Sequence, residues 1–302
     1  MLIKEKNHVL TDMIRNLEQI ENKQWMQDEY AALIDQIEMA NKKFYLHDPD
    51  IIRWVNKFMP NAIRGLKLSD ATVLRSITQG NVVGVWARQT LKTSFTKIAA
   101  IYEALSNEKE VIILLPNETS MRLYERALQF VGLDEVKKEV KTHTKESNVE
   151  RVEFLNGGSI TITNLKGLAI GSEQYKNRTA VKRKRKTRLF ADDFDSIKST
   201  LQEKALGDIF QVIGYKDGNY TILTTPIIRK KDGVQQLSPF QQFVVRNQKN
   251  PEQFHYIHRP TGDEVIQEMK SRGALAFLTK DNVLAEIEAS FNSNEMSILL
   301  GE

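Results

Sequence analysis

The sequence predicts an α/β fold in which a mostly parallel sheet is flanked by helices on both faces. Short apolar runs, which suit strands buried on both sides, recur along the chain and alternate with segments of helical periodicity. Polar or acidic residues directly follow several of these runs, and ligands of open α/β sheets bind at that edge. The chain has 302 residues, 41% of them hydrophobic, which is enough for one large domain with an accessory segment.

The N-terminal part of the chain is predicted to be helical. Apolar residues at helical spacing recur through the first 45 residues. We expect an accessory helix pair there, with a partner-binding arm as the alternative. Asp48 followed by Pro49 is a start signal for a short helix that extends to about residue 58. Ser69 or Asp70 can cap a further helix that runs to about residue 79.

Strands and helices then alternate along the middle of the chain. The predicted strands are residues 82–86, 110–115, 151–155, 159–163, 188–191 and 220–224, and the predicted helices are residues 92–105 and 118–130. The turn residues Asn156, Gly157 and Gly158 join two of these strands into a hairpin. We therefore expect a helical segment at residues 1–60, an α/β core at residues 61–230, and a linker or small subdomain at residues 231–302 that ends in a helix around residues 282–291.

Composition excludes several classes of protein. The chain contains no cysteine, so it has neither a disulfide framework nor a thiolate metal site. No apolar run approaches the roughly 20 residues that a membrane-spanning helix needs. The first residues lack the apolar core and the cleavage site of a signal peptide. We expect a soluble protein in a reducing cytoplasm, with no membrane partner.

The segment between the strand at 82–86 and the helix at 92–105 has the character of a phosphate-binding loop. It runs from Trp86 to Ser94 with the sequence WARQTLKTS, and the backbone N–H groups of such a loop converge on an anion at the helix N-terminus. Lys92 would reach the β- and γ-phosphates of a nucleotide, and the Thr93 hydroxyl would bind Mg²⁺. The usual pattern G-x-x-x-x-G-K-[ST] has glycine where this chain has Trp86 and Leu91.

Two later strands also end in residues suited to nucleotide chemistry. The strand that contains Leu189 ends in Asp192 and Asp193. In a Walker B arrangement the first carboxylate binds Mg²⁺ and the second polarises the attacking water. The strand at 220–224 leads into Thr224-Thr225-Pro226, a position that senses the γ-phosphate in motor ATPases. Together the three signals predict a P-loop NTPase of the ASCE, RecA-like type.

The loop resembles the deviant Walker A motif of tailed-phage DNA-packaging terminase large subunits, commonly S-R-Q-x-G-K-T. Arg88, Gln89, Lys92 and Thr93 match that pattern, and Ala87 and Leu91 depart from it. Residues 154–160, FLNGGSI, are similar to the F-x-N-G-S-x-I hairpin of the family, and residues 224–226 are similar to its coupling motif S/T-T-P. The resemblance covers roughly residues 50–230.

The resemblance implies an ATPase that translocates double-stranded viral DNA into a procapsid. The residues implied to bind ATP are Arg88, Gln89, Thr90, Leu91, Lys92, Thr93 and Ser94. Catalysis would fall to Lys92, to Arg88 near the γ-phosphate and to Asp193 as base, with Mg²⁺ on Thr93 and Asp192. Coupling to movement would fall to Thr224, Thr225 and Pro226. The implied partners are duplex DNA, a portal protein, a small terminase subunit and further copies in a ring, expected to be a pentamer, on a procapsid in the host cytoplasm.

Three departures from the family bear on activity. Leu91 replaces a glycine that lets the loop turn tightly. Asp193 stands where the family usually has glutamate, so the carboxylate is one methylene shorter. The glutamine that recognises adenine is not evident near residues 66–72, where Asp70 is not equivalent to it. These departures are compatible with slow or partner-dependent hydrolysis, or with nucleotide binding without turnover.

A basic run precedes the acidic strand. The net charge of the chain is +4, yet residues 176–188 carry eight basic residues and no acid. Clustered basic side chains bind the phosphate backbone of duplex DNA without reading sequence, although such a run is also typical of a solvated loop. The residues we expect to contact DNA are Lys182, Arg183, Lys184, Arg185, Lys186 and Arg188.

Other functions remain open from the sequence alone. A helicase-like, nucleic-acid-dependent ATPase would share the strand and acid pattern but would need a second RecA-like lobe, for which too few residues follow Pro226. A non-hydrolysing DNA-binding or assembly protein with a degenerate P-loop fits Leu91 and Asp193. The nuclease domain of the family also has no room after residue 226, so we expect no nuclease activity in this chain and, for packaging, a separate nuclease subunit.

Overall fold

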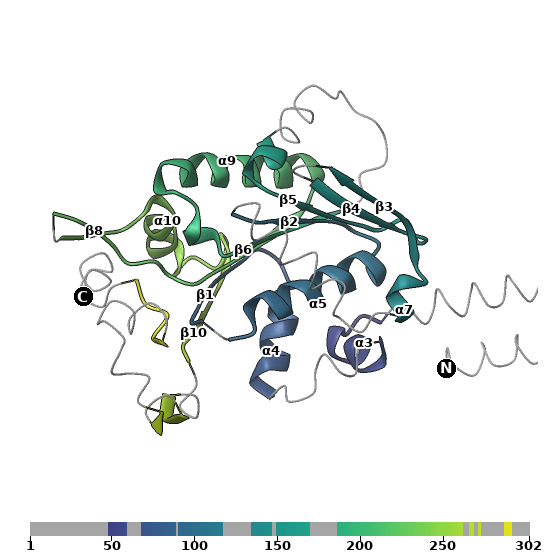
Figure 1. Ribbon diagram of the computed structural model, residues 1–302, viewed down its shortest axis with the longest axis horizontal. Coiled ribbons are helices and arrows are strands. Elements are labelled where there is room, and N and C mark those ends of the chain that lie inside the picture. The colour runs from purple at the N-terminus through teal and green to yellow at the C-terminus, as the bar shows by residue number, and fades with distance from the viewer. Residues whose placement is uncertain are drawn as a thin grey trace, which may run out of the picture. The chain divides into compact units, whose positions relative to one another are not determined.

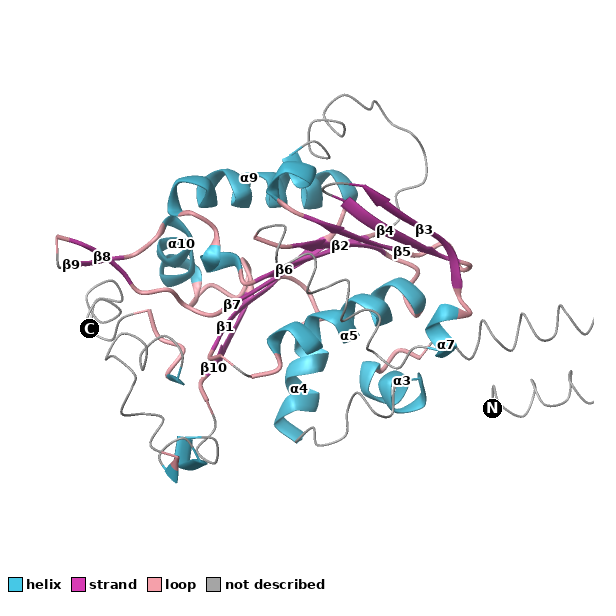
Figure 2. Cartoon of the chain, viewed as in Figure 1, coloured by secondary structure: helices cyan, strands magenta, loops and turns pink. Residues whose placement is uncertain are grey.

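The computed structural model describes residues 48–58, 68–88, 90–116, 134–146, 149–169, 186–232, 234–261, 266–268, 271–272 and 287–291. The chain divides into two compact units, Met1–Asp48 and Pro49–Glu302. All elements described below belong to the second unit (Figures 1 and 2). The predicted helices in the first 45 residues and at residues 118–130 lie outside the described residues.

A single eight-stranded sheet organises this unit. Its strands are β1 (Val82–Trp86), β2 (Glu110–Leu114), β3 (Val140–Glu146), β4 (Val149–Phe154), β5 (Ser159–Thr163), β6 (Thr187–Asp192), β7 (Asn219–Thr224) and β10 (His255–Arg259). Their order is β10-β1-β7-β6-β2-β5-β4-β3. The first six are parallel neighbours, and β4 and β3 are added antiparallel.

Helices cover both faces of the sheet, as predicted for an α/β fold. They are α3 (Ile51–Phe58), α4 (Leu68–Ser76), α5 (Lys92–Leu105), α7 (Asp134–Lys137), α9 (Ser199–Lys216), α10 (Pro239–Asn247) and the short 3₁₀ helix η1 (Phe194–Ser196). Helix α5 packs on β6, β2 and β5, whereas α9 packs on β6 and β7 and contacts α10. Figures 1 and 2 show α9 and α10 on one side of the sheet and α3, α4 and α5 on the other. Every residue of β1 and β6 is buried as a result, which explains the continuous apolar sequence of β1.

Strand β7 lies between β1 and β6 and pairs with both in parallel. The strand before the candidate phosphate-binding loop and the strand that leads to the two acids are therefore separated by the strand that ends at Thr224. This insertion is the arrangement of the ASCE class of P-loop NTPase, and the fold class predicted from the sequence is confirmed. It also brings the carboxyl ends of all three strands to one edge of the sheet.

The hairpin of β4 and β5 has a structural role that the sequence did not reveal. Asn156 Nδ2 donates hydrogen bonds to the carbonyl oxygens of Ala104 at 3.1 Å and Leu105 at 2.7 Å, so the hairpin turn satisfies carbonyls at the end of α5. Asn156 Oδ1 accepts from the N–H of Gly158 at 2.8 Å, which fixes the turn. The hairpin therefore stabilises the end of α5 that is remote from the loop at residue 91.

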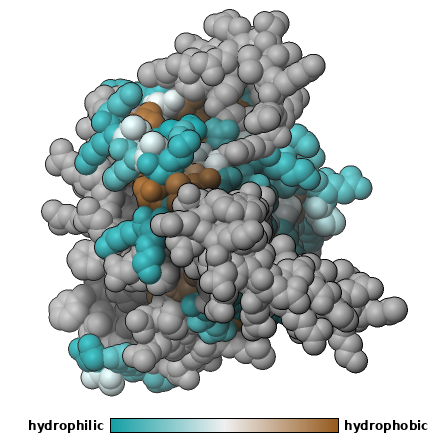
Figure 3. Space-filling view, turned by 90° about the vertical axis from the view of Figure 1, so that its right-hand side faces the viewer, coloured by the Kyte–Doolittle hydropathy of each residue, from teal (hydrophilic) through white to brown (hydrophobic). Residues whose placement is uncertain are grey.

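The far edge of the sheet is polar. Strand β3 pairs only with β4 within the part of the chain that the structure describes, and all its residues after Val140 are exposed. Their sequence, KTHTKE, is hydrophilic, and hydrophilic residues predominate among the described residues on the face shown in Figure 3. Charged side chains on an edge strand disfavour pairing with another chain.

The segment after residue 230 belongs to the α/β unit, which corrects the expectation of a linker or small subdomain. Strands β8 (Arg229–Lys231) and β9 (Val234–Gln236) form a separate two-stranded hairpin. After it, α10 packs against α9, and β10 pairs with β1 in parallel over its whole length. Phe254 joins the same core as Val83 and Val85. The sheet thus draws its outermost parallel strand from residues that sequence patterns did not identify as a strand.

Two predicted helix boundaries also need correction. The N-cap of α3 is Asp50, whose Oδ1 accepts from the N–H of Ile52 at 2.8 Å, so the helix begins after the Asp48-Pro49 pair. Trp54 of α3 packs edge-on against Tyr102 of α5, so α3 belongs to the α/β unit and not to a segment that ends at residue 60. Near the C-terminus, Ala289 has a φ of 51°, and the predicted helix around residues 282–291 does not extend through it.

Among the described residues, no helix combines the length and apolar character needed to cross a membrane.

Candidate nucleotide-binding site

The loop between β1 and α5 is held at both ends by hydrogen bonds. The N–H of Ala87 donates to the carbonyl oxygen of Arg259 on β10 at 2.8 Å. The Thr90 hydroxyl donates to the carbonyl oxygen of Ala87 at 2.7 Å, which closes a turn. Helix α5 then begins at Lys92. The loop therefore leads directly to a helix N-terminus, where free backbone N–H groups attract anions.

Leu91 takes the backbone conformation of the glycine that it replaces. It occupies the N-cap position of α5 with φ 62° and ψ 16°, the left-handed region, and its carbonyl accepts from the N–H of Phe95 at 2.9 Å. Its side chain is 45% exposed. The chain thus keeps the sharp turn of a phosphate-binding loop despite the leucine, at a conformational cost that glycine would not incur.

The Lys92 side chain connects the three strands of the predicted site. Its Nζ donates to Asp193 Oδ1 at 2.9 Å, and it donates to Thr225 Oγ1 at the same distance. Asp193 follows β6 and Thr225 follows β7. The residues around positions 92, 192 and 224 therefore meet at one place at the carboxyl edge of the sheet, as the sequence predicted.

Thr93 and Asp192 form the second contact of the site. The Thr93 hydroxyl donates to Asp192 Oδ2 at 2.8 Å, and Asp192 is buried at the end of β6. A hydroxyl and a carboxylate oxygen suit Mg²⁺, which usually takes one or two protein oxygens and completes its shell with phosphates and water.

Backbone contacts tie the acidic turn after β6 to the end of β7. The N–H of Asp193 donates to the carbonyl oxygen of Leu223 at 2.7 Å. The N–H of Asp195 donates to the buried Thr224 hydroxyl at 2.8 Å. Asp193 itself has φ 57°, a left-handed conformation. This turn directs the Asp193 carboxylate back toward Lys92, and the buried residues Thr225 and Pro226 continue from β7 beside it.

The other residues predicted to bind the nucleotide belong to the loop and to the first turn of α5. Arg88 is exposed in the loop, Thr90 is half-buried, and Ser94 is exposed in the first turn of α5. Gln89 lies outside the described residues.

A second lysine of α5 approaches the acids. Lys97 is buried, four residues after Thr93 and therefore on the same helix face. Burial lowers the pKa of Lys97, and the negative charge of Asp192 acts in the opposite direction. Sequence reasoning did not identify this residue, because a lysine in the second turn of an amphipathic helix usually faces solvent.

Arg259 supports the loop from β10. Its guanidinium forms a salt bridge with Asp70 of α4 and lies 5.3 Å from the ring centres of both Trp86 and Phe95. Trp86 ends β1 and Phe95 lies in the first turn of α5, so the arginine packs against both sides of the loop. Asp70, which the sequence placed near the expected adenine site, is thereby engaged in a structural ion pair.

The basic run divides into an undescribed part and a buried end. Lys182, Arg183, Lys184 and Arg185 lie outside the described residues, and Lys186 is exposed. Arg188 is 0% exposed. It donates to the carbonyl oxygens of Ile77 and Gly80 and to the Thr221 hydroxyl, and burial lowers its pKa to about 10. The expectation that Arg188 contacts DNA is therefore wrong, because this side chain holds the core together.

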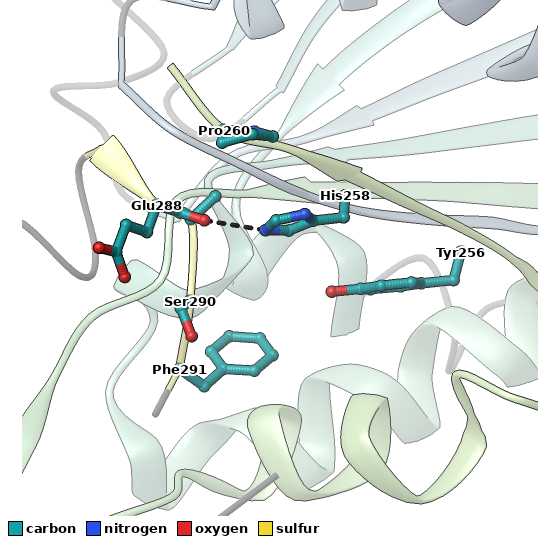
Figure 4. A pocket seen from close by; sticks show the side chains of 7 residues that line it. Tyr256, His258, Pro260, Glu288, Ser290 and Phe291 are labelled. Carbon is teal, nitrogen blue, oxygen red and sulfur yellow. Dashed lines mark hydrogen bonds between the residues drawn. The ribbon is translucent and has the colours of Figure 1, made fainter. Parts of the chain in front are cut away.

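A pocket of about 470 Å³ opens beside β10. Tyr256, His258 and Phe291 border it, and Figure 4 shows their rings turned toward a common space. His258 Nε2 lies 2.8 Å from the carbonyl oxygen of Glu288, which joins residues 287–291 to the strand. None of the nucleotide-site residues predicted from the sequence lines this pocket.

Comparisons with known proteins were made at the levels of sequence and structure. No family model and no curated protein sequence matches the chain. The solved ATPase domain of the large terminase of Thermus phage P74-26 aligns with a TM-score of 0.44 and 14% identity over 70% of this chain and 88% of that domain. The HK97 bacteriophage large terminase aligns with a TM-score of 0.49 and 11% identity over 82% of this chain, which spans 50% of that protein. The N-terminal domain of the phi29 DNA packaging ATPase aligns with a TM-score of 0.37 and 12% identity over 57% and 82% of the two chains.

Proposed function

We propose that this chain is an ATPase that drives the translocation of double-stranded viral DNA into a procapsid. The observation that carries the proposal is the convergence of Lys92, Asp193 and Thr225, with Thr93 and Asp192 beside them, at the carboxyl ends of three parallel strands. One lysine at a helix N-terminus, one buried carboxylate with a hydroxyl and one further carboxylate are the groups that phosphoryl transfer to water requires.

In this proposal each residue has a part in hydrolysis. Lys92 would exchange its present acceptors for oxygens of the β- and γ-phosphates. Thr93 and Asp192 would hold Mg²⁺, which neutralises charge on the phosphates when bound. Asp193, with its side chain about half exposed in the ion pair to Lys92, would orient the attacking water and accept its proton. Exposed Arg88 would stabilise charge at the γ-phosphate.

Coupling to movement would pass through the end of β7. Thr225 contacts the lysine, and Thr224 contacts the acidic turn, so a change at the γ-phosphate reaches both residues through single hydrogen bonds. Thr224, Thr225 and Pro226 form the connection from the nucleotide to the segment that follows β7. This supports the coupling role that the sequence resemblance implies.

Partners follow from the same proposal. Lys182, Arg183, Lys184, Arg185 and Lys186 would contact the phosphate backbone of duplex DNA, without reading its sequence. A portal protein, a small terminase subunit and further copies of this chain in a ring, which we expect to be a pentamer, would complete the packaging machinery in the host cytoplasm. A separate nuclease subunit would cut the DNA.

The test is phosphate release by the purified protein with Mg²⁺ and ATP, in the presence and absence of duplex DNA. Asp193→Asn is expected to lower the rate at least about 100-fold while ATP binding persists, because the lost group acts only on the water. Lys92→Ala is expected to weaken both binding and turnover. Lys249→Ala, which replaces an exposed lysine after α10, is the matched control and is expected to retain full activity.

Three outcomes distinguish the candidate functions. Phosphate release that duplex DNA stimulates and that Lys92→Ala abolishes supports the motor. ATP binding without phosphate release under either condition identifies a non-hydrolysing assembly protein, the reading that Leu91 and Asp193 favour. Turnover that is unchanged in Lys92→Ala would show that the site has been placed wrongly.

A further inference from the structure

Asp195 is a buried carboxylate that the proposed chemistry does not use. It lies in η1, two residues after Asp193, and is 0% exposed. Its side chain accepts hydrogen bonds from Gln202 Nε2 at 3.2 Å, Ile227 N at 2.7 Å, Arg229 Nη1 at 2.8 Å, Ser238 Oγ at 3.0 Å and Gln241 Nε2 at 2.7 Å. A buried carboxylate is costly unless it is paired and hydrogen-bonded. Here five donors from separate segments converge on it.

The donors bracket the hairpin of β8 and β9 at both ends. Ile227 and Arg229 lie where the chain enters the hairpin, and Arg229 also donates to the backbone oxygen of Asp195. Ser238 and Gln241 lie just after the hairpin, where they form the capping box of α10. One carboxylate therefore fixes both ends of the β8–β9 hairpin, whose strand β8 lies away from the sheet in Figure 1. Val234 on this hairpin is 65% exposed.

The same turn is fixed to the nucleotide site on its other side. Asp195 N–H bonds to Thr224, and Asp193 N–H bonds to the carbonyl oxygen of Leu223. The Ser196 hydroxyl donates to the carbonyl oxygen of Asp193 at 2.7 Å, so the turn is braced internally. Only one residue, Phe194, separates the carboxylate that contacts Lys92 from the carboxylate that holds the hairpin. A displacement of this turn would therefore reach the base of the hairpin through direct hydrogen bonds.

We propose that Asp195 is a positioning residue that couples the occupancy of the nucleotide site to the position of the β8–β9 hairpin. Gln202 anchors the carboxylate to α9, whereas Arg229 and Gln241 link it to the segments that bracket the hairpin. When Asp193 and Thr225 adjust to a γ-phosphate, the turn carries Asp195 with it, and the hairpin follows. The inference rests on the proposed function, since it requires a nucleotide at Lys92. To that function it adds the element that would move when nucleotide binds, the β8–β9 hairpin.

The chain offers a direct way to observe the hairpin, because it contains no cysteine. Val234→Cys places a single thiol on β9 for an environment-sensitive fluorophore. Leu155→Cys places the same probe on an exposed residue at the β4–β5 turn, which contacts the opposite end of α5. Each labelled protein is titrated with Mg²⁺ and a non-hydrolysable ATP analogue, and nucleotide binding is measured separately by calorimetry. The expected result is a saturable signal change at position 234 and none at position 155.

Two substitutions on the hairpin then distinguish a loss of coupling between the nucleotide site and the hairpin from a loss of fold stability. Arg229→Ala removes the guanidinium that bonds to Asp195, and Lys230→Ala removes an adjacent exposed lysine of the same strand. Arg229→Ala is expected to reduce the nucleotide-dependent population shift at position 234 by about fivefold or more, while Lys230→Ala leaves it unchanged. Thermal unfolding confirms that both variants are folded, and Arg229→Lys, which restores the charge, is expected to recover part of the response.

The failures of the two proposals are distinguishable. Nucleotide that binds to the labelled wild type without any change at position 234 overturns the coupling role and leaves the proposed function standing. An equal nucleotide-dependent signal change at position 234 in the wild type and in Arg229→Ala also overturns the coupling role. If calorimetry detects no nucleotide binding to the folded wild type, the proposed function fails, and the coupling role fails with it.

Discussion

Leu91 shows how a single residue can keep the geometry of a motif while departing from its sequence. Glycine is usual at this position because it adopts positive φ without steric penalty. Leucine takes the same backbone conformation here, with φ 62°, and leaves its side chain largely exposed beside the loop. The turn is evidently imposed by its surroundings, namely the hydrogen bond from Ala87 to Arg259 and the start of α5.

The first prediction concerns the backbone strain at Leu91. Leu91→Gly is expected to raise the free energy of unfolding by about 0.5–1 kcal/mol, because a left-handed leucine costs roughly 1–2 kcal/mol and glycine returns part of this as chain entropy. Urea denaturation measures the difference. Leu155→Gly is the matched control, since Leu155 is also exposed in a turn but lacks positive φ, and it is expected not to stabilise. A less stable Leu91→Gly would contradict the interpretation of strain.

Arg188 provides the second prediction at the scale of a residue. Arg188→Ala would remove the donor to the Gly80 carbonyl and to the Thr221 hydroxyl, and would leave the Ile77 carbonyl with the Thr221 hydroxyl as its donor. It is expected to lower the free energy of unfolding by about 3 kcal/mol or more. Lys186→Ala, two residues earlier and exposed, is expected to change it by less than about 0.5 kcal/mol. Equal and small effects in denaturant unfolding would show that Arg188 is not a structural residue.

Some of the site residues could be predicted from the sequence and others could not, for a physical reason. Lys92, Asp192, Asp193 and Thr225 each follow a strand, so parallel strand geometry alone brings them together. Asp195 was missed because its donors come from three segments with no common periodicity. Arg188 was misassigned because a basic residue at the end of a basic run gives no sign in sequence that its side chain turns into the core.

The close contact between the β4–β5 hairpin and α5 predicts how a substitution there changes the stability of the protein. A Cβ on Gly158 would lie 2.0 Å from the carbonyl oxygen of Ala104, so Gly158→Ala is expected to force the hairpin from α5 and to lower stability by about 2 kcal/mol or more. Gly207 in α9 has open space around its Cα. Gly207→Ala is expected to raise stability by about 0.5–1 kcal/mol through helix propensity alone. Thermal or denaturant unfolding of the pair provides the check, and two effects of the same sign would refute it.

Elements with a strong periodic or apolar pattern were predicted to within a residue or two. Strand β1 and helix α5 coincide with their predicted ranges, β2 and β7 differ by one residue at one end, and β6 is one residue longer at each end. Strand β10 was missed, because HYIHR carries polar residues that a central strand would exclude. Within the described residues β10 pairs only with β1, as an edge strand does, and it exposes His255 and His258. These residues form a strand because they pair with β1, and a local sequence pattern does not encode such pairing.

At the scale of the whole molecule, the sheet extends across the predicted boundary at residue 230. A chain that ends at residue 250 would lack β10, expose one edge of β1 and lose the anchor of the loop at Ala87. We expect it not to fold cooperatively. A chain that begins at residue 49 removes a similar length but keeps the whole α/β unit, and it is expected to fold and bind nucleotide. Circular dichroism melts and nucleotide titration of both chains test this, and a stably folded shorter chain ending at residue 250 would contradict it.

The position of β1 between two later strands also has a consequence for biosynthesis. Its neighbours β7 and β10 leave the ribosome roughly 140 and 170 residues after it, which at about 5–20 residues per second is on the order of 10–30 s. During that interval the nascent segment VVGVW presents two unpaired edges, a condition that favours aggregation. Chaperone protection of the emerging polypeptide would therefore matter most before residue 259 is translated, because only then can β10 complete the pairing of β1.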